Sequence, residues 1–232
     1  MAPAPCGGRR HRHVRTASRT LAPRRRAVLG NVVDTRVSAL LCARLCHELS
    51  GPVAGVNNGT ELLADEDLDF AHDAVELIGV SARQAADRLQ FYRFAYGFSG
   101  AAAVAGVQPQ DLADRLFGGS RITCEYGDSA AVMPLEWQKL ACNLLLVGAE
   151  ALPRGGRLVL ATSILEIEAV GEAPVLSPET LAALMLVTPV DALNSRTIQA
   201  FFAGVLAASL GYRLVGKAEP RRVSLAAVAT AD

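Results

Sequence analysis

The sequence predicts an α+β protein in which a long antiparallel helical hairpin precedes a layer of helices on a sheet. Three observations support this prediction. Apolar residues recur at helical spacing from Val32 to about Leu63, and again in strictly alternating steps of four and three through residues 71–96. A Gly/Ala-rich stretch at 99–106 then indicates a domain boundary. Beyond it, segments of helical and strand pattern alternate to the C-terminus.

The first predicted helix carries one apolar stripe that contains a proline. The stripe consists of Val37, Leu41, Leu45, Leu49, Pro52 and Val56. Pro52 has no backbone N–H, and the stripe continues beyond it, so we expect it to bend the helix rather than end it. The acidic segment 64–69 predicts a short turn into the next helix.

The second predicted helix carries the most regular periodic pattern in the chain. Its apolar seam consists of Ala71, Val75, Ile78, Ala82, Ala85, Leu89, Tyr92 and Tyr96. A two-helix hairpin buries too little surface to be stable alone, so the pattern predicts a homodimer whose two hairpins form a four-helix bundle. Five aromatic residues lie within 91–98, and we expect them to pack at the base of this bundle.

The remainder of the chain mixes helices and strands. Helices are predicted at 111–117, at 136–152, from a Ser177 cap onward and at 195–210; strands are predicted at 121–126, 157–168, 212–215 and 222–229. This order favours a layer of helices on a sheet of antiparallel strands. We therefore expect three parts: a tail at 1–30, a hairpin domain at 31–100 and an α/β domain at 107–232.

Charge is distributed unevenly along the 232 residues. The chain has 23 basic and 23 acidic residues, but the first 30 residues hold eight arginines and no acid, so the rest holds 15 basic residues against 23 acidic ones. The arginine-rich tail is compatible with nucleic-acid binding or with targeting, but its composition predicts a disordered, solvated segment. Nucleic acid is accordingly not the expected partner.

Composition also indicates the cellular setting. No apolar run approaches the roughly 20 residues that a membrane span needs, so we expect a soluble protein without membrane contact. The five cysteines are scattered without a C-x-x-C pair, which favours a reduced, cytoplasmic environment. Cys42, Cys46 and His47 lie close in sequence, but zinc sites normally need four ligands, so no metal site is expected.

His47 lies within residues 41–53, on a part of the predicted helix that points away from the apolar stripe. Four residues share its face on a helical wheel: Arg44, Gly51, Ala54 and Asn58. A free imidazole is largely neutral at pH 7, so an exposed ring nitrogen can attack phosphorus. Arg44 would pair with the phosphoryl group, and the small residues would let a partner protein approach. The alternative is an ordinary exposed histidine.

A resemblance to a known family favours the phosphorus chemistry. The string HELSGPV at 47–53 resembles the phosphoacceptor box of sensor histidine kinases, and LCARLCHELSGPVAGVNNGTELL at 41–63 resembles the ChpT-type bacterial histidine phosphotransferases more closely. The resemblance implies a homodimeric hairpin bundle followed by an α/β sandwich like a histidine kinase ATPase domain that has lost nucleotide binding. It implies His47 as the phosphorylated residue and Glu48 as its acidic companion, which orients the imidazole or accepts a proton.

The second half lacks most of the residues with which kinases bind ATP. Asn143 matches one of two asparagines four residues apart, but Val147 occupies the second position, and no Asp-x-Gly-x-Gly follows. We therefore expect no cofactor of its own. The phosphoryl group would come from the receiver domain of a hybrid histidine kinase and pass to response regulators, with Mg²⁺ supplied by the receiver domain. Gly51 replaces a kinase Thr or Asn that supports dephosphorylation, so phosphatase activity is not expected.

Two other functions fit parts of the sequence. One is an autophosphorylating histidine kinase with an unusual ATPase domain. The other is a non-enzymatic dimeric scaffold that binds nucleic acid through its basic tail.

Overall fold

The computed structural model of the protein describes Met1 and residues 34–64, 71–97, 108–127, 133–161 and 165–230. The chain separates into two compact units, Met1–Val32 and Val33–Asp232, and the fold below is that of the second. The predicted tail, nearly all of the acidic turn and the Gly/Ala-rich boundary lie outside the described residues.

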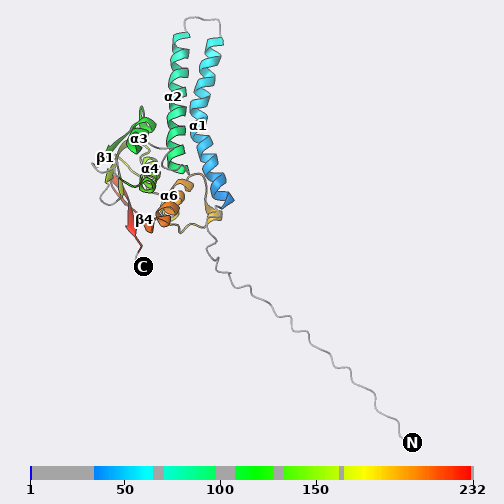
Figure 1. Ribbon diagram of the computed structural model, residues 1–232, viewed down its shortest axis with the longest axis vertical. Helices are drawn as coiled ribbons and strands as arrows, with labels where there is room; N and C mark the ends of the chain where they lie inside the picture. Colours follow the sequence, from blue (N-terminus) through cyan, green and yellow to red (C-terminus); the bar gives the residue numbers. More distant parts are fainter. Residues whose placement is uncertain (2–33, 65–70, 98–107, 128–132, 162–164, 231–232) are drawn as a thin grey trace. The chain divides into compact units, whose positions relative to one another are not determined.

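Two long helices begin the described fold and lie side by side as an antiparallel hairpin (Figure 1). They are α1 (Thr35–Ala64) and α2 (Ala71–Tyr96), as the two apolar patterns predict. Pro52 is buried inside α1, and the helix continues past it as expected. At Gly59 the two helices approach closely, because a Cβ there would lie 2.5 Å from Cγ1 of Ile78 on α2.

The aromatic residues at the end of α2 pack in the protein interior, as predicted. Phe91, Tyr92 and Phe94 are buried within the main hydrophobic core. The rings of Tyr92 and Tyr96 lie 5.2 Å apart, and Tyr96 meets the edge of Phe202 with ring centroids 5.4 Å apart. The base of the hairpin is thereby part of the same core as the C-terminal half.

The C-terminal half is a five-stranded mixed sheet with helices packed on it (Figure 1). Its elements are α3 (Pro109–Phe117), β1 (Ile122–Tyr126), α4 (Leu135–Glu150), β2 (Gly156–Ala161), β3 (Glu166–Val170), α5 (Pro178–Leu184), the 3₁₀ helix η4 (Val190–Ala192), α6 (Ile198–Ser209), β4 (Tyr212–Glu219) and β5 (Arg222–Ala229). The strand order is β1-β2-β3-β5-β4. The α+β class is therefore confirmed. As predicted, Ser177 caps α5, and its Oγ accepts from the N–H of Thr180 at 3.0 Å.

Two details of the predicted sheet are wrong. β1 and β2 pair in parallel, because the chain crosses over through α4 between them, so the strands are not all antiparallel. The single strand predicted at 157–168 is two strands, β2 and β3, which pair antiparallel. The burial pattern shows the break: Leu158 and Leu160 are buried on even positions, whereas Ile167 and Ala169 are buried on odd ones.

α4 is the central helix of the fold. Ten consecutive residues, from Lys139 to Gly148, are buried. One side meets the sheet at Gly148, where a Cβ would lie 2.9 Å from Cδ2 of Leu158. Other sides are covered by α6 and by the base of α2. No helix in the described ranges is long and apolar enough to cross a membrane.

Two glycines of α1, Gly59 against α2 and the exposed Gly51, predict stability changes of opposite sign. Gly59→Ala should lower the free energy of unfolding by about 1–3 kcal/mol, because its Cβ would press on Ile78 and would lie 3.0 Å from the carbonyl oxygen of Ala74. At Gly51 no atom lies within 4 Å of an added Cβ. Gly51→Ala should therefore raise the free energy of unfolding by about 0.5–1 kcal/mol, because alanine has a better helix propensity than glycine. Urea unfolding followed by circular dichroism measures both. Changes of the same sign in the two variants would contradict the close approach of α1 and α2 at Gly59.

Candidate functional site

His47 lies on an exposed strip of α1. Gly51, Ala54 and Asn58 follow it at steps of four, three and four residues, so all four share one face, and all four are exposed. The space beside Gly51 is open, since nothing lies within 4 Å of the position its Cβ would take. The strip combines one nucleophilic side chain with small neighbours, which leaves room for a partner at the imidazole.

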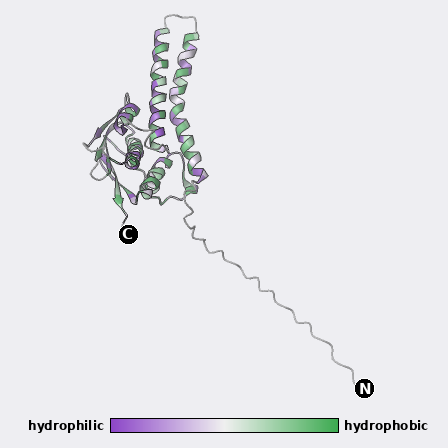
Figure 2. Ribbon diagram, viewed as in Figure 1, coloured by the Kyte–Doolittle hydropathy of each residue, from purple (hydrophilic) through white to green (hydrophobic). Residues whose placement is uncertain are grey.

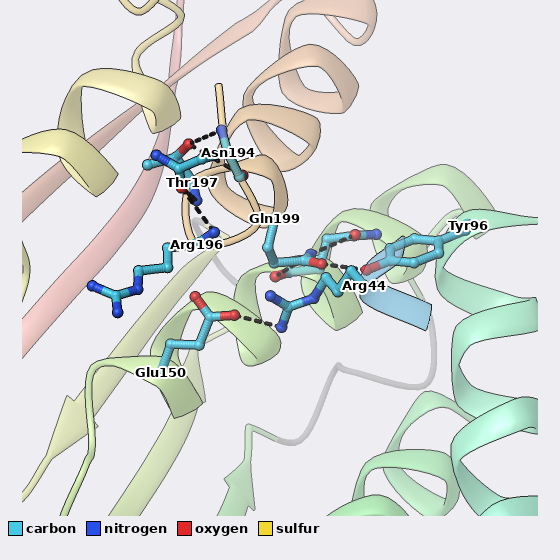
Figure 3. Close-up of polar contacts among 8 residues, drawn as sticks. Arg44, Tyr96, Glu150, Asn194, Arg196, Thr197 and Gln199 are labelled. Carbon is cyan, nitrogen blue, oxygen red and sulfur yellow. Dashed lines mark hydrogen bonds and ion pairs between the residues drawn. The ribbon is translucent and has the colours of Figure 1, made fainter. Parts of the chain in front are cut away.

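Arg44 does not lie on this strip. The helical wheel predicted an exposed guanidinium beside His47, and this placement is wrong. The Arg44 side chain is 11% exposed and forms an ion pair with Glu150 at the end of α4 (Figure 3). The wheel shows only the faces of one helix, and this face of α1 is covered by a helix that lies a hundred residues further along the chain.

Burial and charge set the protonation of this pair. Burial acts against the charged form of Arg44, but Glu150 together with Tyr92, Tyr96 and Glu48 more than compensates, so the pKa of the guanidinium is raised. Burial raises the pKa of Glu150, and Arg44 opposes that rise. Among the described residues, the buried Nε of Arg44 finds no hydrogen-bond partner. The pair is thus a partly desolvated interaction whose two members depend on each other.

Glu48 follows His47 in sequence but faces a different environment. Burial and then the negative charge of Glu48 raise the pKa of the Tyr92 hydroxyl to about 12. Glu48 also acts electrostatically on Arg44 and Glu150. Since adjacent helical residues point about 100° apart, Glu48 is directed toward these buried groups while His47 stays on the exposed strip.

A buried amide network joins α2, α4 and α6 beside the ion pair (Figure 3). Asn143 is fully buried; its Nδ2 donates to the carbonyl oxygens of Ala95 at 2.9 Å and Lys139 at 2.8 Å. Its Oδ1 accepts from Nε2 of Gln199 at 2.8 Å, and Tyr96 donates its hydroxyl to Oε1 of Gln199. Together with the ion pair, these hydrogen bonds connect the base of the hairpin to the C-terminal half.

This network was not predicted from the sequence. Gln199 was included in a predicted buried helix without a role, although a single amide inside a run as apolar as 198–209 signals a buried hydrogen bond. The loop before α6 adds a second anchor, because Arg36 on α1 donates from Nη2 to the carbonyl oxygen of Leu193 at 2.8 Å. Asn194 shapes that loop by accepting from the N–H of Arg196 at 2.9 Å.

In the part of the chain that the structure describes, no group of three or more His, Cys, Asp or Glu residues could hold a metal ion.

Known proteins share both halves of this arrangement. The family model described as the histidine phosphotransferase C-terminal domain matches residues 108–222. Protein phosphotransferase ChpT of Brucella abortus (strain 2308) is 32% identical over 189 residues, which span 77% of this chain and 88% of that protein. A 1.7 Å structure of a bacterial phosphotransferase matches with a TM-score of 0.68 at 29% identity, covering 86% of this chain and 98% of the other.

An exposed histidine on a helical hairpin, held at its base by an α+β layer of this family, defines a histidine phosphotransferase of a phosphorelay. Within that class, the chain belongs to the ChpT-type family. The family expected from residues 41–63 is therefore confirmed.

The Arg44–Glu150 pair predicts a pH-dependent loss of stability. Arg44→Met should lower the free energy of unfolding by about 1–3 kcal/mol at pH 8, because Glu150 loses its partner but keeps some solvent contact. Without Arg44, burial and the charge of Glu48 act unopposed on Glu150 and raise its pKa further. A raised carboxyl pKa favours the folded state at low pH, so the deficit should be smallest near about pH 4 and grow as the pH rises.

Chemical unfolding of both proteins from pH 4 to pH 8 measures this difference. The double variant Arg44→Met/Glu150→Met is the control, because it removes the carboxyl group and should show no such pH dependence relative to the wild type. A deficit that is constant over the range would contradict the interaction.

Proposed function

We propose that His47 is the residue that carries the phosphoryl group. The supporting observation is its position: it is the one histidine in α1, it is exposed, and it lies beside the open space at Gly51. A ring nitrogen attacks the phosphorus of an aspartyl phosphate, the P–O bond to the aspartate breaks, and a P–N bond forms. The reverse reaction delivers the group to a second aspartate.

The partners in this proposal are receiver domains. The donor is the receiver domain of a hybrid histidine kinase and the acceptors are response regulators, because an aspartyl phosphate has enough transfer potential to phosphorylate an imidazole reversibly. Mg²⁺ comes with the receiver domain. Gly51, Ala54 and Asn58 are the contact surface, since their small or polar side chains allow the receiver to bring its aspartate to His47. Glu48 and Arg44 act from behind this surface on the charge of the site.

The transfer needs no nucleotide bound to this chain. A helix that binds ATP must expose polar groups toward the phosphates, and α4 has ten consecutive buried residues. Both N–H donors of the Asn143 side chain and its Oδ1 already form hydrogen bonds within the protein. Binding a nucleotide through Asn143 would break three internal hydrogen bonds in a buried place, which opposes the histidine kinase alternative.

A homodimer completes the proposal. The seam predicted on α2 is only partly covered, since Val75 is 58% and Leu89 51% exposed. α1 carries a second seam at alternating steps of four and three: Cys42, Cys46, Leu49, Val53, Val56, Thr60 and Leu63. Hydrophobic residues run along both hairpin helices (Figure 2). Two apolar heptad seams on one hairpin fit the same surface of a second copy, which gives a four-helix bundle.

The proposed function also implies a cellular compartment. A phosphorelay between receiver domains takes place in the cytoplasm, and the scattered cysteines agree with that compartment. The arginine-rich tail has no part in the proposed transfer.

Substitution of His47 tests the phosphoacceptor. Incubated with a receiver domain labelled by radioactive acetyl phosphate and Mg²⁺, the wild type should acquire acid-labile label, whereas His47→Gln should acquire none while keeping its melting temperature. His72→Gln, which replaces an exposed histidine of α2, is the matched control and should still be labelled. Label on His47→Gln would refute the assignment. A parallel incubation with labelled ATP and no partner should give no label, and label there would favour the kinase alternative.

Charge placed on the apolar seam tests the dimer. Leu89→Glu should convert the dimer to monomers in light scattering at micromolar concentration, because a buried unpaired carboxylate at each equivalent position opposes association. Arg83→Glu, an exposed residue of α2 outside the seam, should remain dimeric. A wild-type protein that is monomeric, or two variants that associate equally, would contradict the proposed bundle.

A further inference from the structure

The turn that follows His47 contains a backbone carbonyl that the helix cannot satisfy. In an α-helix the N–H of each residue donates to the carbonyl oxygen four residues earlier, and Pro52 has no N–H to donate. The carbonyl left without this partner belongs to Glu48, the residue next to His47. A buried or half-buried carbonyl in this state costs free energy unless another donor reaches it.

Arg88 on α2 supplies that donor. Its Nε donates to the carbonyl oxygen of Glu48 at 3.1 Å, across 40 residues of sequence and from the other helix of the hairpin. A guanidinium donor carries charge, so this bond is stronger than the amide bond it replaces. The preceding turn is also held by a side chain, because Ser50 donates from Oγ to the carbonyl oxygen of Cys46 at 2.7 Å.

The hairpin register places Arg88 on the required side. Three contacts define the register: Arg88 with Glu48, Ser81 with Gly55, and Ile78 with Gly59. Ser81 and Arg88 are seven residues apart, so they share one side of α2, and Ser81 touches the position of the Gly55 Cβ. Leu89 is turned about 100° from Arg88, so the apolar seam for a second copy does not compete with this bond.

We propose that Arg88 is a positioning residue for phosphoryl transfer at His47. By capping the Glu48 carbonyl, it holds the helical turn that carries His47 in one orientation despite the hydrogen bond that Pro52 removes. This inference rests on His47 as the phosphoacceptor. Its chemical consequence is on the rate of the bound complex: a ring nitrogen held in line with the aspartyl phosphate reacts faster than one on a loosened turn.

A comparison of the wild type with three variants under single-turnover conditions tests the role. Labelled receiver domain is mixed with increasing concentrations of each full-length variant, which separates the limiting transfer rate from the half-saturating concentration. Arg88→Met should lower the limiting rate about tenfold. The half-saturating concentration should change by no more than about twofold, since the receiver still meets the same exposed strip. Arg88→Lys retains a cationic donor and should recover much of the rate. Arg83→Met, an exposed arginine of the same helix, is the matched control and should transfer like the wild type.

The proline provides the decisive variant. Pro52→Ala restores the N–H that can donate to the Glu48 carbonyl, so Arg88→Met should cost little or no additional rate in the Pro52→Ala background. A purely structural role of Arg88 in hairpin packing would instead cost the same factor in both backgrounds. Thermal unfolding of all variants accompanies the kinetics, and Arg88→Lys supports the comparison if Arg88→Met does not fold.

The outcomes separate the two proposals. If the wild type takes up label and His47→Gln does not, the phosphoacceptor stands; an unchanged limiting rate in Arg88→Met, or an equal loss in both backgrounds, then overturns the role of Arg88. If the wild type takes up no label at all, the function proposed for His47 fails before Arg88 is tested.

Discussion

The attachment of the hairpin base to α4 and α6 is the interaction on which the rest of the structure depends. It combines the Arg44–Glu150 ion pair with the buried amides of Asn143 and Gln199 and the hydroxyl of Tyr96. Hydrogen bonds are directional, and each of these groups would be costly to leave unpaired, so few orientations of the hairpin satisfy all of them. Apolar contacts alone would allow helices to slide. The histidine one turn beyond Arg44 is thereby held at a defined place relative to the C-terminal half.

Elements that follow from a local apolar repeat were predicted from the sequence. Contacts with residues far along the chain were not. Both hairpin helices were located within a few residues, because an apolar repeat is a property of each helix by itself. Arg44 was misplaced because its face is covered by Glu150, about a hundred residues away, and no pattern around Arg44 shows that. The division of 157–168 into two strands was readable in principle, since the buried positions change from even to odd, but the apolar residues hide the change.

Asn143 matches an asparagine of histidine kinases, but its side chain forms hydrogen bonds within this protein. An asparagine at this position in α4 suggests a ligand of magnesium or phosphate, but its amide here bonds to α2, to its own helix and to Gln199. The hydrogen bonds that would have to break for Asn143 to bind a nucleotide also strengthen the attachment of the hairpin.

Different faces of α1 pack against other elements or stay exposed, and Pro52 affects the hydrogen bonding of the turn that follows His47. One face packs against α2, Arg44 pairs with Glu150 at the end of α4, and the strip that carries His47 stays exposed. Pro52 is buried, but it deprives the Glu48 carbonyl of its donor. The helix remains continuous because Arg88 supplies a donor from outside it. The site histidine therefore lies on a turn whose geometry is set by the partner helix as much as by its own backbone, which couples its orientation to the packing of the hairpin.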